Sequence, residues 1–112
     1  MADEIGNPKI RGPKDPVKKG ELVEIKSLIK HPMESGLRKN KETDQLIPAH
    51  YIESVVVEYA GKQVLKATWS GAVSKDPFFS FFVKAESTGP LKMTWKDNKG
   101  QSFTAEAPIT VA

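Results

Sequence analysis

The stretch that decides the fold is Ser54-Val55-Val56-Val57-Glu58-Tyr59, which is followed after a Gly61-Lys62 turn by Val64-Leu65-Lys66-Ala67-Thr68-Trp69. Valine and aromatic side chains dominate the first run, and such residues fit the half-buried surface of a strand better than a helix. A short glycine-containing turn between two such runs is typical of a β-hairpin. The sequence therefore predicts two paired antiparallel strands here.

The segments on either side of this predicted hairpin also carry strand patterns. Val23, Ile25, Ser27 and Ile29 alternate with other residues at the period of two that a strand with one buried face requires. No segment shows a helical period. Further strand-like runs, separated by turns, occupy residues 78–83, 91–96, 101–106 and 109–111. Six or seven short strands with regular turns predict an all-β fold, namely an immunoglobulin-like antiparallel β-sandwich of about seven strands.

The chain has the length of one small domain. Its first twenty residues contain three prolines and three glycines, which interrupt regular structure, so we expect residues 1–20 to be an N-terminal arm or edge segment and residues 21–112 to form the domain. The N-terminus is acidic and lacks the apolar segment of a signal peptide, which by itself suggests the cytoplasm. No apolar run is long enough to predict a membrane span.

Composition excludes several kinds of site. The formal net charge is +3 and the pI about 9.1, but the lysines are scattered among acidic residues, which is typical of a solvated surface rather than a nucleic-acid-binding stripe. The chain has no cysteine, and so no disulfide, thiolate nucleophile or zinc–thiolate site. Ser27, Ser35 and Ser74 lack the flanking pattern of an activated nucleophile, so we predict no enzyme activity.

A predicted loop between residues 31 and 50 collects the side chains most suited to site chemistry. It holds both histidines of the chain, His31 and His50, together with Met33, and these three could in principle bind a metal with Glu34 or Glu53. Two histidines nearly twenty residues apart are a weak metal signal. The alternative is that they hydrogen-bond the loop backbone, and we predict neither metal nor cofactor.

The same loop suits a binding surface. Pro32 stiffens the backbone and Met33 can adapt to an irregular apolar contour. Arg38 and its neighbour Lys39 could attract an anionic group. We therefore predict partner contacts at His31, Met33, Arg38, Lys39 and His50. The alternative is a loop that merely closes one end of the sandwich.

A run of four phenylalanines predicts a second contact surface. In a strand over residues 78–83, Phe79 and Phe81 would face the core, whereas Phe78 and Phe82 would lie on the outer face. Two aromatic side chains on one outer face are typical of a subunit interface. The alternative is that the N-terminal arm or the long loop covers them.

Several motifs together resemble the SoxZ family, one of the two subunits of the SoxYZ sulfur-carrier complex of thiosulfate oxidation. The resemblance extends from about residue 19 to about residue 106. It is carried by Ile29-Lys30-His31-Pro32-Met33-Glu34, Gly36-Leu37-Arg38-Lys39, Ile47-Pro48-Ala49-His50-Tyr51-Ile52 and Ala72-Val73-Ser74-Lys75-Asp76-Pro77.

This resemblance implies an immunoglobulin-like fold and a non-catalytic role. It implies a heterodimer with a SoxY-like subunit, whose C-terminal cysteine on a mobile arm carries the sulfur intermediates, and transient contacts with other Sox enzymes. Arg38 or Lys39 could then attract the terminal sulfonate of the loaded arm. The resemblance also implies a periplasmic location, reached by export with a signal-bearing partner. The alternative function is a stand-alone β-sandwich that binds a small anion or a metal.

Overall fold

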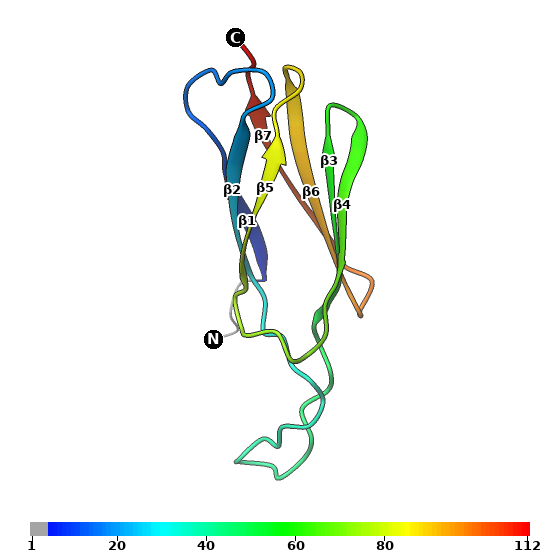
Figure 1. Cartoon of the computed structure of the whole chain (residues 1–112). Coiled ribbons are helices and arrows are strands. Elements are labelled where there is room, and N and C mark those ends of the chain that lie inside the picture. The colour runs from blue at the N-terminus through cyan, green and yellow to red at the C-terminus, as the bar shows by residue number, and fades with distance from the viewer. Residues whose placement is uncertain (1–4) are drawn as a thin grey trace.

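The computed structural model describes residues 5–112 as a two-layered β-sandwich (Figure 1). Residues 1–4, where the N-terminal arm was predicted to begin, lie outside the described part. The strands are β1 (Gly6–Arg11), β2 (Leu22–Lys30), β3 (Ile52–Tyr59), β4 (Lys62–Thr68), β5 (Phe78–Lys84), β6 (Gly89–Asp97) and β7 (Ser102–Ile109).

The strands form two antiparallel sheets. One has the order β1-β2-β5 and the other the order β4-β3-β6-β7. Side chains that alternate along β2 and β6 point into the space between the sheets, where Ile25, Ile29, Val55, Met93 and Trp95 are fully buried. The predicted all-β sandwich of about seven strands is confirmed, and the alternation of residues 23–29 is the burial pattern of β2.

The predicted hairpin is β3 and β4. Tyr59 pairs with Lys62, so Ala60 and Gly61 are the two turn residues, and both have positive φ values of 52° and 83°. Positive φ at both positions is the geometry of a type I′ turn, which matches the twist of the strands on either side. The turn lies one residue earlier than the Gly61-Lys62 pair that the sequence suggested.

The seventh strand is not the one that the sequence predicted. Residues 109–111 were expected to form a separate last strand, but Ile109 ends β7, and Val111 makes only an isolated parallel bridge with Val17. The strand that brings the total to seven is instead β1, the first in the chain. It lies in the segment expected to be an arm or edge, and it forms the edge of its sheet. Gly6 permits this because a Cβ there would lie 2.8 Å from the ring of Phe103.

The long connection between β2 and β3 leaves the sandwich at one end and projects away from both sheets (Figure 1). We call residues 33–50 the finger. It contributes to an elongated molecule of 57 × 24 × 19 Å. Isolated antiparallel bridges join Glu34 to His50 and Lys39 to Leu46, so the finger is a narrow, irregular hairpin. Among the described residues, no helix is long and apolar enough to cross a membrane.

Candidate functional site

The base of the finger is built around a buried carboxylate. Asp97, the last residue of β6, accepts hydrogen bonds on Oδ2 from His31 Nε2 at 3.1 Å and from His50 Nε2 at 2.8 Å. Its Oδ1 accepts the backbone N–H groups of Lys99 and Gln101 at 3.0 and 2.8 Å. All four contacts hold the carboxylate in place, so Asp97 ties the end of β2 to the start of β3.

This arrangement sets the charges of the cluster. Burial alone would raise the pKa of Asp97, but the hydrogen bonds from the two histidines and from two backbone amides outweigh it and hold the pKa below its ordinary value. The pKa of His31 is also lowered, chiefly because burial disfavours the imidazolium, and the hydrogen bond to Asp97 opposes only part of that effect. The cluster at neutral pH is therefore an aspartate with a neutral His31.

The hydrogen bonds also assign the tautomer of His31. The backbone N–H of Met33 donates to His31 Nδ1 at 3.3 Å, so the proton of the neutral ring lies on Nε2, which faces Asp97. Met33 itself adopts a positive φ of 52°, which is uncommon for a residue with a side chain. Its Sδ accepts the backbone N–H of Ile52 at 3.3 Å. Met33 therefore anchors the finger to β3.

We tested whether the cluster suits a metal. Ligand atoms of His31, His50 and Asp97 lie within 4.8 Å of one another, and this is the one such group among residues 5–112. A metal on His31 Nε2 would require the proton to move to Nδ1, which already faces the N–H donor of Met33. Asp97 would also lose both histidine donors. As arranged, the three side chains form a closed hydrogen-bond network, and binding a metal would have to break its hydrogen bonds to Asp97 and move the proton of His31.

His31, Met33 and His50, which the sequence predicted on a binding surface, are buried. Their exposed fractions are 1%, 6% and 9%, because the two imidazoles turn inward to Asp97 and the thioether packs into the core. In this conformation their side chains position the finger rather than present a surface. A direct contact between these three residues and a partner stays a prediction.

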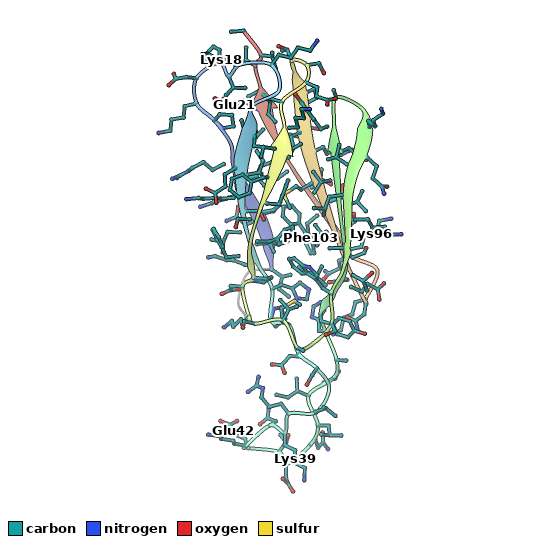
Figure 2. The ribbon with its side chains drawn as sticks, in the orientation of Figure 1. Lys18, Glu21, Lys39, Glu42, Lys96 and Phe103 are labelled. Carbon is teal, nitrogen blue, oxygen red and sulfur yellow. The ribbon has the colours of Figure 1, made fainter. Side chains whose placement is uncertain are left out.

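The other predicted residues are exposed. Arg38 forms an ion pair with Glu34 four residues earlier, and the hydrogen bond from Arg38 lowers the pKa of that carboxyl. Lys39 Nζ lies 4.0 Å from Asp44 Oδ1. Both cations are on the finger, and their attraction for an anionic group stays a prediction. Figure 2 shows Lys39 at the far end of the finger, away from the sheets.

Phe78 and Phe82 lie on the outer face of the β1-β2-β5 sheet, with exposed fractions of 62% and 65%. Leu28 lies opposite Phe78 in the neighbouring strand, and Leu22 is also exposed on β2, at 41% and 66%. We call these four side chains the apolar face. Phe81 faces the core at 9%, and Phe79 is partly buried against it. Neither the arm nor the finger covers Phe78 and Phe82 in the described chain.

Sequence reasoning missed Asp97 and the exposed Leu37 and Leu46 of the finger. Asp97 is 66 residues from His31 and 47 from His50, so no local spacing could have linked them. A signal was available for Leu37, since it lies in the polar segment from Ser35 to Lys39 and would have no core to enter.

Comparisons with known proteins agree with this fold. The superoxide reductase (neelaredoxin) of Ignicoccus hospitalis has a TM-score of 0.72 and 18% identity, over 96% of this chain and 82% of that one. The superoxide reductase of Nanoarchaeum equitans has a TM-score of 0.62 and 19% identity, over 93% and 92%. Both are similar in fold alone at this level of identity.

A third solved structure is described as the sulfur carrier protein SoxY from Chlorobium limicola f thiosulfatophilum. Its TM-score is 0.61 at 14% identity, over 94% of this chain and 78% of that one. No curated protein sequence matches the chain significantly. The model of the family described as sulphur oxidation protein SoxZ matches residues 10–108. Because this match covers most of the chain, the protein belongs to the SoxZ family.

Proposed function

We propose that this chain is the non-catalytic subunit of a sulfur-carrier heterodimer. Membership of the SoxZ family places it in sulfur oxidation and implies a SoxY partner. The chain has no cysteine, so it cannot hold sulfur on a thiol of its own. The C-terminal cysteine of a SoxY-like subunit supplies that thiol, while this chain serves as the body that other Sox enzymes contact transiently.

The apolar face is the observation that carries this proposal. Phe78, Phe82, Leu22 and Leu28 expose large apolar side chains on one side of one sheet, interspersed with the exposed polar residues Glu24, Lys26, Ser80 and Lys84. Aromatic side chains are enriched where subunits meet. A stable heterodimer buries roughly 800 Å² of each partner.

The test is a double substitution, Phe78→Ser with Phe82→Ser, assayed for binding to the SoxY-like subunit by calorimetry. Loss of two aromatic anchors should weaken binding by roughly 100-fold or more. Lys92→Ser, on the exposed face of β6 in the other sheet, is the control and should bind normally. Circular dichroism should show that both variants stay folded. Unchanged affinity of the double variant would contradict the proposal, and so would its unfolding, which would make these residues structural.

We also propose that the heterodimer works in the periplasm and is exported together with a signal-bearing partner. The support is the family context. Fractionation of cells that express the partner with and without its signal sequence tests this. Recovery of this chain in the periplasm in both cases, or in neither, would contradict co-export.

A further inference from the structure

The outer face of the β1-β2-β5 sheet carries the excess positive charge of the molecule. Along each of these strands, exposed side chains alternate with buried or half-buried ones. The exposed set includes five cations and one acid, namely Lys9, Arg11, Lys26, Lys30, Lys84 and Glu24. The whole chain has 17 cationic and 14 acidic side chains, so the positions outside this set hold 12 cations and 13 acids and carry a net charge of −1. The strands therefore bring charge that is scattered in the sequence to one face.

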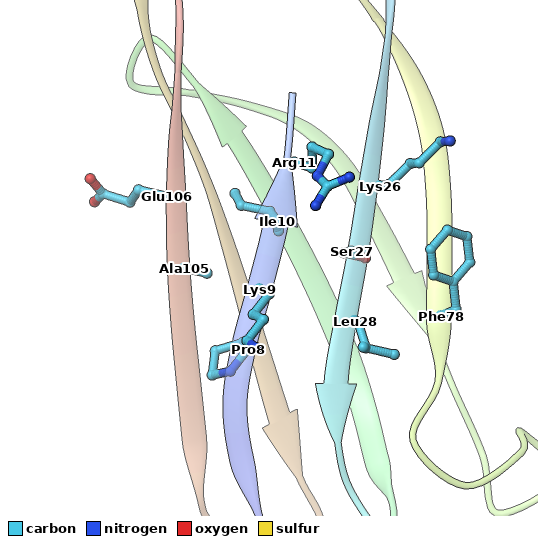
Figure 3. Close-up of a pocket in the computed structure, with 10 residues that line it drawn as sticks. All are labelled: Pro8, Lys9, Ile10, Arg11, Lys26, Ser27, Leu28, Phe78, Ala105 and Glu106. Carbon is cyan, nitrogen blue, oxygen red and sulfur yellow. The ribbon is translucent and has the colours of Figure 1, made fainter. Parts of the chain in front are cut away.

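Two of these cations oppose each other directly. Arg11 of β1 pairs in register with Lys26 of β2, on the same face of the sheet (Figure 3). Like charges that lie directly opposite on neighbouring strands destabilise a sheet. Lys26 Nζ lies 3.8 Å from Glu24 Oε1, whereas Arg11 and Lys9 form no ion pair within residues 5–112. The described chain therefore neutralises this pair only in part.

A groove of about 580 Å³ lies beside the Arg11–Lys26 pair. Its apolar lining includes Leu28 and Phe78, which also belong to the apolar face (Figure 3). Lys9, Leu28 and Phe78 lie in one row across the three strands. The charged lining of the groove is Lys9, Arg11, Lys26 and Glu106. The groove therefore continues the apolar face and adds cations at its edge.

Charge and side-chain chemistry together select the occupant of this face. A second copy of the chain is disfavoured, because two faces with the same excess of cations would repel each other. Nucleic acid would meet Glu24, which lies opposite Phe82 and would repel phosphate, and the aliphatic Leu22 and Leu28 offer its bases no stacking surface. A planar lipid surface would leave the concave groove unfilled. A protein surface with carboxylates around an apolar patch matches both the cations and the leucines.

We infer that the SoxY-like subunit fills the groove with an acidic segment, whose carboxylates lie against Lys9, Arg11 and Lys26, while its apolar side chains cover the apolar face. The inference rests on the proposed function, because it takes this face to be the subunit interface, and it adds the chemistry of the partner surface. Carboxylates of the partner neutralise the Arg11–Lys26 pair, so the pair lowers the stability of the free chain and contributes to binding in the heterodimer. Opposite charges also raise the rate at which the subunits associate.

The test reverses two of these charges, Lys9→Glu with Arg11→Glu, and measures binding to the SoxY-like subunit at salt concentrations from about 50 to about 500 mM. At the lowest salt the affinity should fall by roughly 100-fold, chiefly through slower association, and the fall of affinity with salt seen in the wild type should disappear. Lys66→Glu with Lys96→Glu is the matched control, since both lysines are exposed on the other sheet, opposite the neutral Val56 and Ser54. It makes the same change in net charge and should lower the affinity by less than about threefold.

Two further measurements identify the partner groups and separate binding from folding. Arg11→Glu alone should raise the melting temperature of the isolated chain by about 1–5 °C while it weakens the heterodimer, because it turns a like-charged pair with Lys26 into an opposite-charged one. A carbodiimide, which couples an amine to a carboxylate in contact with it, should join Lys9 and Lys26 to acidic residues of the SoxY-like subunit. Lys9→Arg with Lys26→Arg should abolish these links and keep the affinity.

Unchanged salt dependence in the Lys9→Glu, Arg11→Glu variant would overturn the inference, and so would carbodiimide links that involve only other lysines. Binding of the wild-type chain to single-stranded nucleic acid or to phosphatidylglycerol vesicles, lost in this variant while the heterodimer is unaffected, would assign the face to a polyanion or a membrane instead. Failure of the proposed function is distinguishable, because the wild-type chain would then not bind the SoxY-like subunit at all. Loss of binding in the phenylalanine double variant with normal binding in the charge variant would contradict this inference alone.

Discussion

Replacing Asp97 with alanine should destabilise the protein severely. The substitution removes the acceptor of His31 and His50, whose partner carboxylate is fully buried. A hydrogen bond to a charged group contributes about 1.5–3 kcal/mol, and a buried donor left unpaired costs about 1–3 kcal/mol. The exposed backbone at Lys99 and Gln101 can bind water instead. Loss of the acceptor for both histidines should lower the free energy of unfolding by about 3–5 kcal/mol. The total free energy of unfolding of a domain is about 5–15 kcal/mol.

Urea denaturation followed by tryptophan fluorescence measures this loss. The midpoint should fall while the m-value stays constant, and the melting temperature should drop by about 10–20 °C. Asp15→Ala is the control, since Asp15 is an exposed aspartate outside the strands and its loss should change stability by less than about 0.5 kcal/mol. Asp97→Asn should be intermediate, because an amide keeps one acceptor oxygen and places a donor at the other position. A loss below about 1 kcal/mol in Asp97→Ala would refute the anchoring role of the cluster.

Two further predictions concern the same end of the molecule. Stability should fall as the pH drops below 6.5, because the pKa of His31 is lower in the folded protein than in the unfolded chain, so the unfolded chain binds the proton first. Stability should fall again below pH 3.8, because the pKa of Asp97 is also lower in the folded protein and the unfolded chain again binds the proton first. Urea midpoints measured from pH 7 to pH 3 report both losses, and His31→Asn should remove most of the first one; an unchanged slope would contradict it. Gly71→Ala should shift the amide resonances of the finger and cost about 1–3 kcal/mol through its clash with Ser35, whereas Ala72→Ser in the same turn should do neither.

The sequence predicted the strands whose side chains alternate strongly. Val23, Ile25, Ser27 and Ile29 fall on one face at a period of two, so the period alone placed β2, and the phenylalanine run gave the correct faces of β5. It missed β1 because Gly6 and Pro8 weaken every strand pattern there. In the structure, the strand tolerates them through an irregularity in register between Gly6 and Lys9, at the sheet edge.

The candidate site was predictable only in part. The sequence identified the loop and its histidines, but the role of those histidines depends on Asp97, which tertiary structure alone brings to them. From the sequence, a lone aspartate before a turn is expected to hydrogen-bond the backbone of that turn, and Asp97 Oδ1 does accept two of its backbone N–H groups. Only its second oxygen serves the cluster. No one-dimensional pattern distinguishes the two uses.

The histidine–aspartate cluster has a mechanical consequence. His31 follows β2 of one sheet, whereas Asp97 ends β6 of the other sheet and His50 lies just before β3 of that same sheet, so the finger is rooted in both layers at once. Because the interior between the layers is close-packed, they resist sliding, and the tip keeps its bearing. The carboxylate of Asp97 therefore couples the direction of the finger to the relative position of the two sheets.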